Sequence, residues 1–447
     1  MKKIKYIFYI PVMLFALAMT SCEDTAKNPV FGDDELPRIF GWPLGNAFSV
    51  DIEDSLVLDF TISPANDATY QWFLDDVEIS TDKRVEIEFD EVKEYNIKFV
   101  VTRNNVVNSR QAIVNVTEDR PFEPKPYQKK MIGFLTRDGS LSDIDFAHLT
   151  HLVISSAVVG EVEGKLVDTT FTGMNIPQIV AAAHSAGVYV MLDVTGNVVN
   201  LTGGGLYADY AFFNVIADPA KRTTAINTII KFATDNKLDG INIFLNNTSE
   251  GSLDQAVVKS FFEAIPDALP EGPNGVFFYS ATVPGGWTTQ TLAPVSKIDA
   301  IDWINIQAFR YEDLTPVSHS PQWAAADLAA QWMGLGVPKE KIVIGFPAFG
   351  LHYFLPDDGT VVGWGNLWQF TAYKSFKSLL ATDPDAHTKN LIAVDDGIFY
   401  DGHPAVIEKA TYVVDQEFGG LMMWSLESDT KDPVKSLLKT AYTGLGN

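Results

Sequence analysis

The chain has 447 residues, of which 46% are hydrophobic, a composition that is ordinary for a globular protein and long enough for more than one domain. Its 57 acidic and 33 basic residues give a net charge of −24, which argues against a surface for nucleic acid or another polyanion. Because Cys22 is the single cysteine, an internal disulfide framework is excluded and stability has to come from core burial.

Residues 1–21 have the pattern of a secretory signal, with lysines at the start and an apolar run from about Tyr6 to Ala18. Small or polar residues precede Cys22, so the segment resembles a bacterial lipoprotein signal in which this cysteine is lipid-modified. The alternative is an ordinary secretory signal followed by a chance cysteine. A transmembrane helix is disfavoured because the run is shorter than the roughly 20 residues that a bilayer core requires.

Residues 22–36 form the next segment, an acidic start followed by a tether that contains proline, glycine and aspartate. The acidic start resembles the surface-export signal of Bacteroidota lipoproteins. We therefore expect an outer-membrane protein, held by its lipid anchor and exposed at the cell surface.

Residues 37–118 contain short runs of alternating apolar residues separated by Asp, Asn, Gly and Pro turns, which predict an all-β sandwich. Trp72 resembles the buried tryptophan of an immunoglobulin-like or PKD-like module. The favoured interpretation of this module is a spacer that holds the next domain off the membrane, and direct ligand binding is the alternative. The proline-rich segment 119–129 is the predicted linker.

From residue 130 to residue 447, apolar strand-like runs alternate with amphipathic helical patterns. Strands that are apolar on both faces and followed by helices are typical of an all-parallel sheet. About eight such pairs predict a (β/α)8 TIM barrel, in the α/β class. The segment 351–404, which precedes the last helices, is the predicted insertion.

The segment 238–247, LDGINIFLNN, has a strand period that places Asn242, Phe244 and Asn246 on one face. It resembles the signature D-G-x-D-x-D-x-E of glycoside hydrolase family 18, the chitinases and endo-β-N-acetylglucosaminidases. Asp239 and Gly240 match that signature. The three following acidic positions of the signature are Asn242, Phe244 and Asn246 here, and none of these side chains donates a proton near neutral pH.

The resemblance extends over the whole predicted barrel. It rests on Gly133 in the first strand, on segments 148–159 and 341–350, and on Trp424, which stands where the family places the tryptophan that floors its sugar site. Together these segments imply the family 18 fold.

The resemblance implies substrate-assisted hydrolysis, in which the acetamide of the sugar attacks the anomeric carbon. That chemistry needs an acid, an orienting carboxylate and a sixth-strand tyrosine and aspartate. The corresponding residues are Asn246, Phe244, Phe309 and Arg310, and the third-strand segment 193–196 also departs from the family pattern. We therefore expect no catalytic residue. Losing the acid costs about 10²- to 10⁴-fold in rate, and losing charge stabilisation costs a further ~10²- to 10³-fold.

The candidate ligand-binding residues lie at predicted strand ends or in loops. At the carboxyl ends of barrel strands we expect Asn246, Gln307, Arg310 and Trp424. In loops we expect Tyr311, Trp287 and Trp364. Packing or local hydrogen bonding is the competing interpretation of each. Glu250, Glu312 and Glu427 lie off the register that a replacement acid would need.

Neither metal-ligand spacing nor a phosphate-binding loop occurs in the sequence, so no cofactor is predicted. The hypothesis is a glycan-binding lipoprotein with an inactive family 18-like barrel. Its ligand would be an N-acetylglucosamine-containing N-glycan, mucin or chitin oligosaccharide, and its partner an outer-membrane glycan transporter. Two alternatives stay open: an active glycosidase with relocated catalytic groups, and a protein-interaction subunit of a glycan uptake system.

Overall fold

A computed structural model describes residues 35–43, 46–117, 122–162, 164–196, 210–244, 255–272, 275–284, 292–309 and 313–447. Among these residues, no helix combines the length and the apolar character that crossing a membrane requires.

Residues 38–117 are rich in strands. They form β1 (Arg38–Phe40), β2 (Ala47–Asp51), β3 (Leu56–Leu58), β4 (Thr61–Ser63), β5 (Ala68–Leu74), β6 (Val77–Ser80), β7 (Val85–Ile87), β8 (Glu94–Arg103) and β9 (Val106–Thr117). Five of them make a sheet in the order β2-β9-β8-β5-β6, and β1–β4 and β3–β7 are separate pairs. Trp72 is fully buried and stacks on Phe99 with ring centroids 4.1 Å apart. This region is consistent with the predicted β-sandwich.

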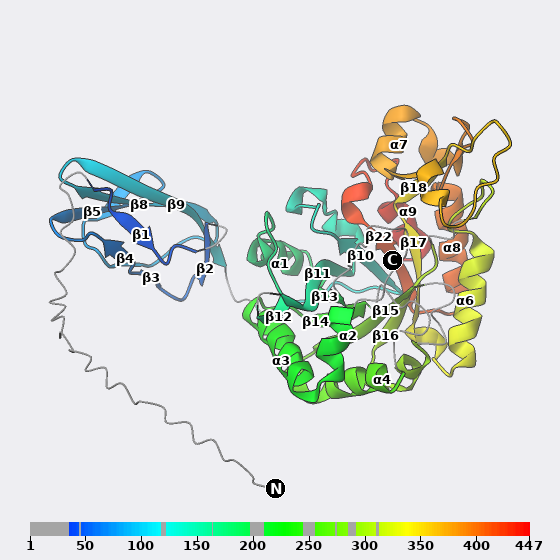
Figure 1. The fold of residues 1–447 in the computed structure, drawn as a ribbon, viewed down its shortest axis with the longest axis horizontal. Coiled ribbons are helices and arrows are strands. Elements are labelled where there is room, and N and C mark those ends of the chain that lie inside the picture. The colour runs from blue at the N-terminus through cyan, green and yellow to red at the C-terminus, as the bar shows by residue number, and fades with distance from the viewer. Residues whose placement is uncertain are drawn as a thin grey trace, which may run out of the picture. The chain divides into compact units, whose positions relative to one another are not determined.

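The second part of the chain is a closed barrel of parallel strands (Figure 1). Its strands are β10 (Lys130–Leu135), β11 (His151–Val162), β13 (Tyr189–Gly196), β14 (Gly240–Phe244), β15 (Phe278–Pro284), β16 (Trp303–Gln307), β17 (Ile342–Pro347) and β22 (Gly420–Trp424). The barrel closes because β10 pairs with both β11 and β22. β12 (Lys165–Asp168) adds an antiparallel strand to β11. The predicted (β/α)8 architecture is confirmed.

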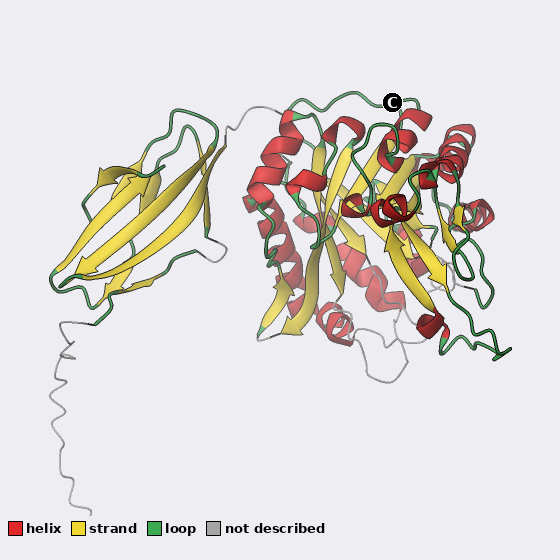
Figure 2. Ribbon diagram, turned by 90° about the horizontal axis from the view of Figure 1, so that it is seen from above, coloured by secondary structure: helices red, strands yellow, loops and turns green. Residues whose placement is uncertain are grey.

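Helices surround the strands on the outside (Figure 2). They are α1 (Ile176–Ser185), α2 (Tyr210–Ala217), α3 (Pro219–Asp235), α4 (Gln255–Ala264), α6 (Gln322–Gly334), α8 (His403–Asp415) and α9 (Leu437–Gly444). Outward strand residues such as Ile241, Ile243 and Ile304 join one large apolar core with the helices. Inward residues fill the barrel itself, and burial on both faces explains the nearly continuous apolar runs.

An antiparallel sheet follows β17, where the sequence predicts an insertion. Its elements are β18 (Phe349–Tyr353), β19 (Thr371–Ser375), β20 (Leu391–Ile392) and β21 (Ile398–Tyr400), with α7 (Phe376–Thr382) between them. The strand order is β19-β18-β21-β20.

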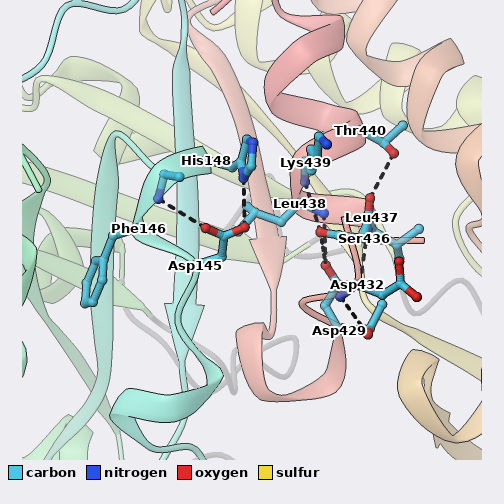
Figure 3. Close-up of polar contacts among 12 residues, drawn as sticks. Asp145, Phe146, His148, Asp429, Asp432, Ser436, Leu437, Leu438, Lys439 and Thr440 are labelled. Carbon is cyan, nitrogen blue, oxygen red and sulfur yellow. Dashed lines mark hydrogen bonds and ion pairs between the residues drawn. The ribbon is translucent and has the colours of Figure 1, made fainter. Parts of the chain in front are cut away.

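The carboxylate of Asp429 holds the start of α9 (Figure 3). It accepts hydrogen bonds from the Ser436 hydroxyl at 3.1 Å and from the backbone amides of Leu437 and Leu438 at 3.2 and 3.0 Å. These amides begin a helix and have no partner within it, so the carboxylate supplies one. Burial raises the pKa of Asp429 to about 6 against these hydrogen bonds, which lower it.

Residues 122–129 pack against the amino-terminal end of the barrel. Phe122 stacks on His184 at 4.5 Å, and the Lys125 ammonium donates to the Phe146 carbonyl at 2.6 Å. The side-chain oxygen of Asn447 accepts from the backbone amide of Gln128 at 2.7 Å. Residues 118–121 lie outside the described residues, and the domain boundaries given above stay predictions.

Candidate functional site

The two residues that match the family signature, Asp239 just before β14 and Gly240 at its start, have structural roles. The buried Asp239 carboxylate accepts from the Val190 amide at 2.7 Å and contacts the His184 ring nitrogen at 2.8 Å. A Cβ on Gly240 would lie 2.4 Å from the Phe278 carbonyl oxygen, so only glycine fits this strand pairing. Together these two residues hold the start of β14 between its neighbouring strands β13 and β15.

Asn242 is fully buried at the centre of a polar network inside the barrel. Its amide nitrogen donates to the Asp193 carboxylate at 2.7 Å. Its oxygen accepts hydrogen bonds from Ser280, Thr282 and Asn305, at 2.8, 3.1 and 3.2 Å. An amide engaged on both sides has little capacity left for a ligand, so Asn242 holds neighbouring strands together.

Asp193 is the carboxylate of this network, one strand away from the position at which the family signature has its first internal acid. It accepts from the Ser155 hydroxyl at 2.7 Å as well as from Asn242. Burial raises its pKa to about 6 from an ordinary 3.8, whereas the hydrogen bonds from Ser155, Asn242 and Val194 lower it. The carboxyl group of Asp193 therefore serves as a hydrogen-bond acceptor inside the barrel.

The raised pKa of Asp193 predicts a pH-dependent effect of Asp193→Asn. Because the pKa of Asp193 is higher in the folded than in the unfolded protein, its contribution to stability is fully present below the unfolded pKa of 3.8. It is lost as the pH rises through the folded pKa of about 6. The asparagine of the variant does not titrate, so this residue causes no fall in stability in this pH range. The free energy of unfolding of the variant minus that of wild type is thus expected to increase by about 2 kcal/mol from pH 4 to pH 7. Urea unfolding at each pH measures it, and a constant difference would contradict the assignment.

Phe244 lies above this network and belongs to a group of aromatic rings. It is 2% exposed, and its ring packs against Trp424 in a T-shaped arrangement with centroids 5.8 Å apart. Trp424, which is partly exposed at the end of β22, also contacts Phe134 at 5.2 Å. At this position the barrel presents rings in place of charged groups.

Phe309 extends the same apolar lining beyond the end of β16. It is buried with Phe349 and Met422 in the cluster against which Trp424 packs. The ring centroids of Phe309 and Phe349 lie 5.9 Å apart. The residue that stands at the sixth-strand tyrosine position therefore carries no hydrogen-bonding group and fills the barrel interior.

Gln307 and Thr195 are the polar exceptions near this lining. Gln307 is 4% exposed, and within the described part of the chain its amide nitrogen has no acceptor at hydrogen-bond distance. The Thr195 hydroxyl, two residues after Asp193 on the same face of β13, is buried and likewise without a partner. Thr195 is not among the predicted site residues, although the period of two from Asp193 places it on the inward face.

Glu427 follows β22 but is occupied as a hydrogen-bond acceptor. One carboxylate oxygen accepts from the Thr136 hydroxyl at 2.6 Å and from the Ser425 hydroxyl, and the other accepts from the Thr136 amide at 3.3 Å. This arrangement fits a structural carboxylate that ties β10 to β22.

Trp364 lies in the insertion, 64% exposed. Its neighbours Val362 and Leu367 are buried in a cluster with Leu351 and Tyr353, so the segment that carries the ring is anchored on both sides. The Asn366 side chain accepts from the Gly363 amide at 2.8 Å and closes the turn. The exposed ring is thus held on an ordered support.

Trp364→Ala is expected to weaken glycan binding by about fivefold if the ring is a sugar platform, because it removes about 1 kcal/mol of apolar contact. Thermal stability should not change, since the side chain is mostly exposed. Calorimetric titration measures the affinity. Trp323→Ala, at a 58% exposed tryptophan of α6, is the matched control. Equal affinities of the two variants would show that Trp364 is not part of the binding site.

Several predicted site residues lie outside the described residues: Cys22, Asn246, Trp287, Arg310 and Tyr311, together with Glu250 and Glu312. Of the predicted residues within them, Phe244 and Phe309 belong with Trp424 to the aromatic lining, and Gln307 ends the strand from which Phe309 follows. Trp364 lies apart on the insertion. In the described ranges no group of three or more His, Cys, Asp or Glu side chains is placed to hold a metal ion.

The profile of the family described as "Glycosyl hydrolases family 18" matches residues 128–429. A probable endochitinase of Caenorhabditis elegans is 25% identical over 267 residues, which cover 51% of this chain and 43% of that protein. The chain thus spans less than half of this relative's length.

Two solved structures show the same fold. The crystal structure of a chitinase from Bacteroides thetaiotaomicron aligns with a TM-score of 0.56 at 22% identity, over 71% of this chain and 96% of that one. A family 18 chitinase from Cycas revoluta in complex with (GlcNAc)3 aligns with a TM-score of 0.55 at 17% identity, over 71% and 100% of the two chains.

Proposed function

Because the chain belongs to glycosyl hydrolases family 18 by a match over residues 128–429, we propose that its barrel binds N-acetylglucosamine-containing glycans without hydrolysing them at an enzymatic rate. One observation carries the proposal. The catalytic strand has Asn242, Phe244 and Asn246 in place of acids, whereas Trp424 keeps a partly exposed ring beside Phe244.

The described carboxylates around the barrel interior support the lack of catalysis. Asp193 is fully buried and bonded to Ser155 and Asn242, and Glu427 accepts from Thr136 and Ser425. A general acid has to reach the leaving oxygen, within hydrogen-bond distance or through one water. Losing the acid and the groups that polarise the acetamide together costs on the order of 10⁴- to 10⁷-fold in rate.

The class of ligand follows from the family and from the chemistry of the site. The Cycas revoluta relative was crystallised with (GlcNAc)3. In this chain the faces of Trp424 and the neighbouring phenyl rings offer apolar area to the CH face of a sugar ring. The net charge of −24 favours a neutral ligand over a sulfated one.

The location and partner are part of the same proposal. A lipid on Cys22 would hold the protein at the outer membrane, facing outward, with residues 37–118 as a spacer. The barrel would then pass captured oligosaccharides to an outer-membrane glycan transporter. Detergent-phase partitioning of wild type, lost in Cys22→Ala, tests the anchor.

A glycan array probed with the purified chain from residue 22 onward, followed by calorimetric titration, tests the function. We expect chitooligosaccharides, N-glycans or mucin chains to bind with dissociation constants below about 1 mM, which corresponds to roughly 4 kcal/mol. Incubation with the same oligosaccharides should release no products above background. Turnover at an enzymatic rate would establish an active glycosidase, and absence of all glycan binding would favour a protein-interaction subunit.

A further inference from the structure

Gln307 is a buried side chain whose amide nitrogen has no hydrogen-bond partner among the described residues. It is the last residue of β16, and only 4% of it is exposed. Asn305, two residues earlier on the same face, donates to Asn242 inside the barrel. By the period of two, Gln307 points inward one step nearer the carboxyl end of the strand, where active sites of this barrel type lie.

The polar neighbour of Gln307 on the same face of β16, Asn305, is already fully hydrogen-bonded. Asn305 donates to Asn242 and Thr282, and its oxygen accepts from the Trp303 indole at 3.1 Å. The amide nitrogen of Gln307 stays outside this network. A buried donor without an acceptor costs folding free energy, so a bond completed by a ligand or an ordered water would recover that cost.

The surroundings restrict that ligand. Phe309 follows two residues beyond the end of β16 and joins the apolar cluster against which Trp424 packs. Thr195 is the register partner of Phe244, and its buried hydroxyl also lacks a partner. A site with apolar rings, one amide donor and one hydroxyl suits an uncharged ligand with both a CH face and oxygen acceptors.

We propose that the Gln307 amide nitrogen donates a hydrogen bond to an oxygen of the bound glycan, and that Thr195 bonds the same sugar. This inference rests on the proposed glycan-binding function and assigns its polar contacts. The acceptor is either a sugar hydroxyl or an acetamide carbonyl, which share the same chemistry. Phe244 and Phe309 have no hydrogen-bonding group, so in this proposal Gln307 and Thr195 supply the hydrogen bonds to the sugar.

Gln307→Met tests the proposal, because methionine keeps the shape of the side chain and removes the donor. Calorimetric titrations use penta-N-acetylchitopentaose and cellopentaose, which lacks acetamido groups. We expect affinity to fall at least tenfold while the melting temperature stays the same or rises. A structural role would instead lower the melting temperature. Gln331→Met on α6, where the side chain is exposed, is the matched control.

The two sugars distinguish the acceptors. A loss confined to the acetylated sugar identifies the acetamide carbonyl, and an equal loss for both identifies a hydroxyl. Unchanged affinity, or a lower melting temperature of Gln307→Met, overturns the assignment while leaving glycan binding by wild type intact. If wild type binds no glycan, the proposed function fails and this inference fails with it. Gln307→Leu, which also removes the donor and adds no charge, gives the second measurement if the methionine variant does not fold.

Discussion

Lys409→Met is expected to lower the free energy of unfolding by about 3 to 5 kcal/mol, because it leaves a buried carboxylate without its counter-charge. Lys409 of α8 and Asp401 before it are each 1% exposed in their side chains, with the ammonium 2.9 Å from the carboxylate. The ammonium also donates to the Ser320 carbonyl at 2.8 Å. The pair therefore connects α8 to the segment that leads from β16 into α6. Urea unfolding at neutral pH measures the loss.

The double variant Lys409→Met/Asp401→Asn separates loss of the pair from exposure of a bare charge. Neutralising both partners should recover more than half of the lost stability, because most of the cost comes from the unpaired carboxylate. A double variant no more stable than Lys409→Met would assign the effect to packing of the lysine stem. A loss below about 1 kcal/mol would show that this buried pair contributes no more than an exposed ion pair does.

Trp424→Ala is expected to weaken glycan binding about 30- to 150-fold, because losing one buried tryptophan face removes about 2 to 3 kcal/mol of apolar contact. Calorimetry with a chitooligosaccharide measures the affinity. The ring also packs against Phe134 and Phe244, so stability should fall too. Thermal unfolding must therefore show that the variant is folded at the titration temperature.

Trp424→Phe is the control for the shape of the site. A phenyl ring keeps an apolar face, so this variant should retain most of the affinity and most of the stability. If both variants bind as wild type does, Trp424 fills the core and the sugar lies elsewhere. If both lose binding equally, the indole itself makes a contact that a phenyl ring cannot replace.

The strand pattern of this chain predicts much of the geometry around β14. The period of two puts Asn242 and Phe244 on one face, and the structure has both inside the barrel while Ile241 and Ile243 face the helices. The absence of acids at these positions is a matter of residue identity alone. Local periodicity and residue type suffice for these statements because neither depends on distant partners.

The hydrogen-bond partners of each side chain could not be predicted from the sequence. Asn242 bonds Asp193, which is 49 residues away, and Asn305, which is 63 residues away. Whether a polar side chain near a strand end is engaged or free depends on such contacts. Asn305 is satisfied, whereas Gln307, on the same strand and the same face, is not. No local pattern distinguishes the two.

The sequence by itself determined the barrel class, the family and the lost proton donors of the catalytic strand, because alternating apolar periods and residue chemistry are local properties. Only the tertiary structure decided that Asp193 is committed to a buried network, that Glu427 is occupied, and that Gln307 and Thr195 keep unpaired groups. The physical reason is that hydrogen-bond satisfaction and burial arise from side chains on different strands, which meet only when the barrel closes.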